Sequence, residues 1–289
     1  MIYKSASHWQ SSRNKRVMLF GMSGLGKTHI SSLLRNSGNW FHYSVDYRIG
    51  TRYMGEYIAD SFKRIAMQTP ELRDLLLSDS IYIASNITFD NLTPLSTYLG
   101  KPGDSSKGGL EFAEYLRRQD QHRQAEISAL MDTSRFIERA DEIYQYDNFI
   151  CDSSGSICEV VDPENPEDPV LSALSDQVLM VAIQGSDSHT AELIKRFDRA
   201  PKPMYYQPKF LAEKWAQYLA LNKVTEALVD PDDFIRWAYA QALAHRQPRY
   251  SAMAKWGVSI TADELSRVQT PSDFTDLISM ALERRDEKL

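Results

Sequence analysis

Five short runs rich in apolar residues, each followed by a polar or small residue, alternate with stretches of helical periodicity. The runs are 16–20, 41–45, 149–151, 178–183 and 257–260. Continuous apolar runs of this length are typical of parallel strands that are covered on both faces by helices. The alternation therefore predicts an α/β fold in three layers, with a parallel five-stranded sheet.

Two intervals between these runs are too long for simple crossovers. The first, at about 86–145, has helical composition and contains a turn-rich stretch, 100–109, that predicts a mobile loop. The second, at about 204–252, spaces its aromatic and aliphatic residues as two amphipathic helices do. We expect one domain over 14–289 with two helical insertions, closed by a helix at 272–284.

The sequence between the first run and the next helical stretch reads GMSGLGKT, which fits the phosphate-binding pattern G-x-x-x-x-G-K-[ST]. Glycines let successive backbone N–H groups converge on an anion at a helix N-terminus. On this motif the chain resembles the P-loop NTPase superfamily. Lys27 is then expected to reach the β- and γ-phosphates of ATP, and Thr28 to bind Mg²⁺. The predicted nucleotide contacts are Gly21, Met22, Ser23, Gly24, Leu25, Gly26, Lys27, Thr28 and His29.

Asp152 closes the third apolar run and is followed by Ser-Ser-Gly-Ser. An aspartate at this place would hold Mg²⁺ together with Thr28, as the Walker-B acid does; capping of the next turn is the alternative. The D-x-x-G pattern of GTPases fits the same residues. The N-K-x-D sequence that reads guanine is missing after the fourth run, so the sequence favours ATP over GTP.

Two arginines near the end of a predicted helix follow the fourth run, within 189–203. In this segment the chain resembles the small-molecule kinases of the superfamily, such as shikimate, gluconate and nucleoside-monophosphate kinases, whose arginines lead into a lid. The resemblance implies that Arg196 and Arg199 cover the transferring phosphoryl group. The alternative is a solvated helix end, where basic side chains are favoured in any case.

Asp46 follows the second run, and Arg48 and Arg52 come soon after it. Shikimate-type kinases have an acid here that meets the acceptor hydroxyl. The resemblance implies that Asp46 orients or deprotonates an acceptor, while Arg48 and Arg52 hold an anionic group. The alternative for Asp46 is a helix cap. The long interval after Asp46, and the absence of the D-G-x-P-R sequence of adenylate-type kinases, leave the acceptor itself open.

Composition narrows the range of partners. The chain has 289 residues and a net charge of −6, so it lacks the overall basic balance of proteins that neutralise a nucleic-acid backbone. A local cluster of Arg117, Arg118 and Arg123 keeps a nucleic-acid-end kinase as an alternative. No apolar stretch approaches ~18 residues, so we expect neither a signal peptide nor a membrane span, and a cytoplasmic location.

These features together predict a Mg²⁺- and ATP-dependent kinase that acts on a small anionic or hydroxyl-bearing acceptor. The competing class is an ATPase switch that engages a protein partner through its helical insertions. An exposed apolar patch on the helices of 208–245 would favour that second class.

Overall fold

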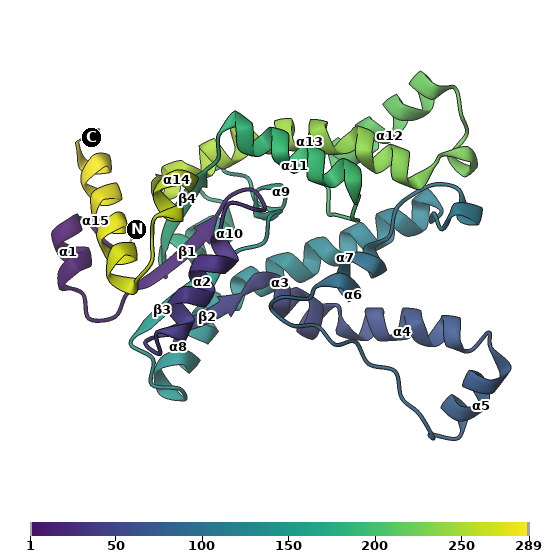
Figure 1. Ribbon diagram of the computed structural model, residues 1–289, viewed down its shortest axis with the longest axis horizontal. Helices are drawn as coiled ribbons and strands as arrows, with labels where there is room; N and C mark the ends of the chain where they lie inside the picture. Colours follow the sequence, from purple (N-terminus) through teal and green to yellow (C-terminus); the bar gives the residue numbers. More distant parts are fainter. Residues whose placement is uncertain (1, 288–289) are drawn as a thin grey trace. The chain divides into compact units, whose positions relative to one another are not determined.

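The computed structural model describes residues 2–287 and contains a five-stranded parallel sheet with the order β2-β3-β1-β4-β5 (Figure 1). The strands are β1 (Arg16–Phe20), β2 (Trp40–Ser44), β3 (Asn148–Asp152), β4 (Leu179–Gln184) and β5 (Val258–Thr261). The predicted α/β fold with five parallel strands is confirmed. Each strand overlaps its predicted run because a central parallel sheet requires residues that can be buried on both faces.

The central strand β1 determines where the glycine-rich loop 21–26 leaves the sheet. Its residues 17–20 are fully buried, and Leu19 lies opposite Asp152 on β3 and Val181 on β4. The chain runs from β1 to β2 on one side of the sheet and later enters β4 on the other side. The strand order therefore reverses beside β1, and such switch points are where α/β sheets bind ligands, outside the carboxyl ends of the strands.

The chain divides into two compact units. Unit 1 comprises the described parts of 1–45, 126–200 and 237–289 and contains the sheet. The helices wholly within it are α1 (Ala6–Ser11), α2 (Lys27–Asn36), α8 (Thr133–Glu142), α9 (Ile157–Val160), α10 (Pro169–Ser175), α11 (Asp187–Arg199), a 3₁₀ helix (Ala254–Trp256), α14 (Ala262–Ser266) and α15 (Pro271–Asp286).

Unit 2 comprises 46–125 and 201–236 and is helical. Its elements are a π-helix (Ile49–Tyr53), α4 (Gly55–Ala66), α5 (Pro70–Leu77), α6 (Thr93–Leu99), α12 (Pro208–Asn222) and the 3₁₀ helices Ser105–Lys107 and Glu226–Leu228. Three further helices begin in one unit and end in the other: α3 (Val45–Arg48), α7 (Phe112–Met131) and α13 (Pro231–Met253).

The turn-rich stretch 100–109, which the sequence predicts to be a mobile loop, is anchored within unit 2. Asp104 N donates to Val229 O at 2.8 Å, and Lys107 Nζ lies 2.9 Å from Asp230 Oδ2. Gly103 has a φ of +135°, and a Cβ there would lie 2.3 Å from Val229 O. Only glycine allows this close approach.

Near the N-terminus, α1 packs on α15, where the fully buried Trp9 donates from Nε1 to Thr275 O at 2.9 Å. Over the described residues, no helix has both the length and the apolar character needed to cross a membrane.

Candidate nucleotide-binding site

The loop between β1 and α2 has a backbone that requires its glycines. Gly21, Gly24 and Gly26 all have positive φ angles, of 145°, 82° and 94°. A Cβ on Gly21 would also lie 2.7 Å from the carbonyl oxygen of Ile183 on β4. The loop therefore wraps tightly over the ends of β1 and β4, as the predicted phosphate-binding motif requires.

Lys27, the first residue of α2, turns back into this loop. Its side chain is buried, and Nζ donates to Gly21 O at 2.9 Å and to Met22 O at 3.0 Å. A buried ammonium is retained only where hydrogen bonds and opposite charge compensate its lost hydration. The loop thus carries a positive charge beside the N-terminus of a helix, which itself favours anions.

Thr28 and Asp152, which the sequence assigns to Mg²⁺, are brought together. Thr28 Oγ1 donates to Asp152 Oδ2 at 2.7 Å, although the residues are far apart in the chain. Burial holds the pKa of Asp152 above its ordinary value. The charge of Lys27 and the hydrogen bond from Thr28 oppose this shift without reversing it. Two hard oxygen ligands beside a phosphate loop fit Mg²⁺, which usually takes one or two protein oxygens and completes its shell with water and phosphate.

His42 on β2 is a part of this site that sequence reasoning missed. Its Nε2 lies 3.9 Å from Asp152 Oδ2, and the side chain is fully buried. Burial, and secondarily the charge of Arg35, lower the pKa of His42 to about 4, so the imidazole is neutral at neutral pH. The only signal in the sequence was a polar residue inside an apolar run.

The segment after Asp152 touches the phosphate loop directly. A Cβ on Gly155 would lie 2.4 Å from Ser23 Oγ, so a larger residue could not sit there without displacing the serine. Ser153 N donates to Leu19 O at 3.2 Å, which continues the pairing of β3 with β1 past the end of the strand. The D-x-x-G stretch and the glycine-rich loop are therefore in contact.

The helix α11 places one of the two predicted lid arginines at the loop. Its start is fixed by a capping box between Ser186 and His189, and near its end Phe197 stacks on Tyr239 with ring centres 3.8 Å apart. A Cβ on Gly24 would lie 3.9 Å from Arg196 Nη1. The side chain of Arg199 is exposed and makes no hydrogen bond or ion pair within the part of the chain that the structure describes.

The residues predicted to meet an acceptor all belong to unit 2. Asp46 is the second residue of α3, so it does not occupy the position before the helix that a cap requires. The guanidinium of Arg48 lies over the ring of Tyr53, 5.5 Å from its centre, and Arg52 is exposed. Their roles toward an acceptor stay predictions.

A pocket of about 340 Å³ opens beside the phosphate loop, within unit 1. It is lined by Gly24, Leu25, Gly26, His29, Ile30, His189, Ala262, Leu265 and Ser266. The lining combines loop backbone, two imidazoles and aliphatic side chains, and this mixture suits a flat heteroaromatic group. Of the residues predicted from the motif, Gly24, Leu25, Gly26 and His29 line this pocket.

Comparison with known proteins adds little to this geometry. No protein-family model and no curated protein matches the chain. Among solved structures, the chain is similar to shikimate kinase from Bacteroides thetaiotaomicron, with 16% identity, 95% of this chain and 97% of that chain covered, and a TM-score of 0.34. A likeness at this level carries no argument about activity, which has to come from the site itself.

Proposed function

We propose that this protein is a Mg²⁺- and ATP-dependent phosphotransferase. The observation that carries the proposal is the buried Lys27 inside a glycine loop at the start of α2, next to the hydrogen-bonded pair of Thr28 and Asp152. This combination provides a cation, a helix N-terminus and two oxygen ligands in one place, and each of them favours a triphosphate with its metal.

The role proposed for Lys27 is to bind phosphate oxygens of ATP. Two of its hydrogen bonds go to neutral carbonyl oxygens, those of Gly21 and Met22. Phosphate oxygens carry charge, and charge-assisted hydrogen bonds are stronger than those to neutral acceptors. Exchange of the carbonyls for phosphate therefore favours the bound state.

Thr28 and Asp152 are proposed to hold the Mg²⁺ that accompanies ATP, and bound Mg²⁺ would neutralise charge that develops on the phosphates. The base is proposed to occupy the pocket between His29 and Leu265. Arg196, beside Gly24, would then stabilise the charge of the transferring group. Arg199, three residues further on, is proposed as its companion in the lid.

The acceptor is proposed to be a small anionic or hydroxyl-bearing molecule. Asp46 would orient or deprotonate its hydroxyl, and Arg48 and Arg52 would bind its negative charge. This part rests on the order of these residues after β2, and on their chemistry.

A second candidate, an ATPase switch that binds a protein partner, is favoured by one observation in unit 2. Large apolar side chains are exposed on α4, α5 and the segment after them: Tyr57, Ile65, Met67, Leu72, Leu75, Leu77 and Tyr82. On the predicted helices of 208–245, the exposed large apolar residues are Leu221 and Leu228. Several large exposed apolar side chains within one stretch of the chain, 57–82, favour an interaction surface.

The release of ADP by the purified protein distinguishes the two candidates. A phosphotransferase releases ADP slowly when no acceptor is present. It releases ADP faster when a pool of polyols and hydroxy acids is added that contains an acceptor. The Asp152→Asn variant provides the background from contaminating activities. Turnover that is acceptor-independent but absent from the variant would favour the switch, and failure to bind ATP would contradict both candidates.

A further inference from the structure

The short loop 153–156, which connects Asp152 to α9, is held from one side by a buried carboxylate. Glu126 on α7 is fully buried and accepts hydrogen bonds from the hydroxyls of Ser154 and Ser156, the latter at 2.8 Å. All three residues belong to unit 1. One glutamate thus fixes the residues on both sides of Gly155.

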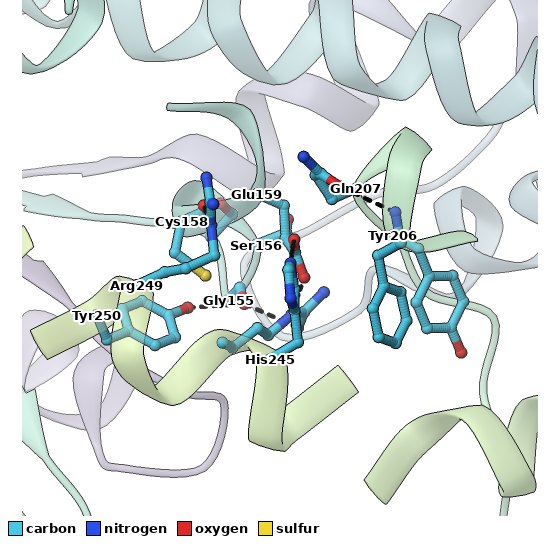
Figure 2. Close-up of polar contacts among 12 residues, drawn as sticks. Gly155, Ser156, Cys158, Glu159, Tyr206, Gln207, His245, Arg249 and Tyr250 are labelled. Atoms are coloured by element: carbon cyan, nitrogen blue, oxygen red, sulfur yellow. Dashed lines mark hydrogen bonds and ion pairs between the residues drawn. The ribbon is translucent and has the colours of Figure 1, made fainter. Parts of the chain in front are cut away.

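Side chains of α13 hold the same loop at Gly155 itself. Arg246 Nη1 donates to Gly155 O at 3.1 Å, and the hydroxyl of Tyr250 donates to the same oxygen at 2.8 Å. Figure 2 shows Tyr250 pointing at Gly155, with Glu159 close by. Arg246 Nε also donates to the buried Glu159 at 2.7 Å, which compensates the buried guanidinium charge. We refer to Glu126, Arg246 and Tyr250 as the loop clamp.

The loop clamp acts on the loop 153–156. The proposed metal ligand Asp152 lies at one end of this loop, and the glycine-rich loop 21–26 lies beside it. Asp152 immediately precedes the clamped residues, and Gly155 abuts Ser23. Burying charged groups is costly, and apolar packing could fill the same volume more cheaply. Hydrogen bonds differ from apolar packing in that they fix the direction of each peptide group.

We propose that Glu126, Arg246 and Tyr250 are positioning residues that hold the loop 153–156 so that Asp152 is oriented for Mg²⁺ beside the phosphate loop. The inference rests on the proposed function, because it requires a Mg²⁺–nucleotide complex at Thr28 and Asp152. None of the three residues follows from a nucleotide-binding motif, and all three act through the loop.

The test is the factor by which Mg²⁺ strengthens ATP binding, obtained by calorimetric titration with Mg²⁺ and with EDTA. Glu126→Gln retains the shape of the side chain but leaves one oxygen to accept from two serines. Tyr250→Phe removes a single hydroxyl and leaves no buried charge. In each variant we expect this factor to fall roughly threefold to tenfold, while the affinity measured in EDTA stays within about twofold of the wild-type value.

Two controls separate positioning from general stability. Glu164→Gln removes an exposed partner of Lys255, 3.5 Å away in the same unit, and should leave the Mg²⁺ factor unchanged. Asp152→Asn should nearly abolish the factor. An unchanged factor in both clamp variants would overturn the inference, and so would a parallel loss of both affinities with a lower melting temperature.

The wild-type titration separates failure of this inference from failure of the proposed function. Wild-type protein that binds ATP more tightly with Mg²⁺, together with clamp variants that behave identically, contradicts the loop clamp alone. Wild-type protein that binds no ATP in either buffer contradicts the proposed function, and the clamp with it.

Discussion

Arg196 and Arg199 lie on the same stretch of α11, but they differ in their surroundings. Both are exposed, but Arg196 approaches Gly24 of the glycine-rich loop, whereas Arg199 is the last residue of the helix. A residue that stabilises transferring charge contributes to kcat more than to KM, because its contact strengthens in the transition state. The two arginines therefore form a matched pair for testing a lid.

We expect Arg196→Ala to lower kcat on the order of tenfold to a thousandfold, with a smaller effect on KM. Arg196→Lys should recover only part of the rate, because lysine lacks the planar fork of the guanidinium. Arg199→Ala should have the smaller effect of the two. Steady-state kinetics with Mg-ATP provide the comparison. A change in kcat below about twofold for Arg196→Ala would mean that the end of α11 is only a solvated helix terminus.

Asp152 offers a second test at the scale of one residue. Asp152→Asn keeps the shape of the side chain but removes the charge that helps to hold Mg²⁺. We expect ATP binding in EDTA to be nearly retained and turnover at saturating Mg-ATP to fall at least tenfold. If turnover stays within about twofold of wild type, the metal role belongs to another acid.

The residues that the sequence could reveal are those whose signal is local. Lys27 and Thr28 lie inside one motif, and Asp152 ends an apolar run, so short patterns were enough to propose these residues for the site. Glu126 reaches Ser154 across 28 positions, and Arg246 reaches Glu159 across 87. Such pairs form only through the tertiary fold, and no periodicity along the chain encodes them.

Among the elements, α13 shows tertiary contacts overriding a local rule. The sequence places the end of its second amphipathic helix near His245, but the helix continues to Met253 with Pro248 inside it. Proline removes one hydrogen bond of the helix and crowds the preceding turn. Arg246 and Tyr250 on either side of it both bond Gly155 O, and Arg249 donates to Cys158 O at 2.6 Å, so the last turns are held from outside.

The strands show the opposite situation, in which local pattern and fold agree. Short apolar runs were enough to locate all five, because a parallel sheet covered by helices leaves polar residues few places within its strands. The bounds of β1 match the predicted run, and those of the other four strands differ from theirs by one residue, as is usual for element ends. What the runs could not show was which strands pair.

The start of β5 provides a stability test at this scale. A Cβ on Gly257 would lie 1.8 Å from Met180 O, so Gly257→Ala forces the backbone of β5 away from β4. We expect the free energy of unfolding, measured by urea denaturation, to fall by roughly 1–3 kcal/mol. Gly38→Ala is the matched control, since nothing lies near its Cβ and only its φ of +85° is strained. An equal or smaller loss for Gly257→Ala would contradict this packing.

At the scale of the whole molecule, the sequence predicted more of the structure of unit 1 than of unit 2. Unit 1 carries the sheet and the phosphate loop, and its fold follows from well-separated signals. Unit 2 overlaps the predicted insertions only in part, because residues 126–145 and 237–252 belong to unit 1 and residues 46–85 belong to unit 2. The hydrogen bond from Asp104 to Val229 within unit 2 had no signal in the sequence. The residues proposed to meet an acceptor, Asp46, Arg48 and Arg52, also lie in unit 2.

Nucleotide choice is a property that the whole of unit 1 should determine. The pocket beside the loop is lined by imidazoles and aliphatic groups, and the N-K-x-D sequence is missing after β4. We expect ATP to compete at least as well as GTP when both displace a fluorescent adenine nucleotide. A hundredfold preference for GTP would replace the proposed kinase with a GTPase.

The central claim is that the loop around Lys27 binds the phosphates of ATP, and calorimetric titration of wild-type protein and Lys27→Ala with Mg-ATP tests it most directly. Loss of a charge-assisted contact worth roughly 1.5–3 kcal/mol should weaken binding about tenfold or more. Lys255→Ala, which removes an exposed lysine of the same unit, should bind as wild type does. Equal ATP affinity in wild-type protein and Lys27→Ala would contradict the account.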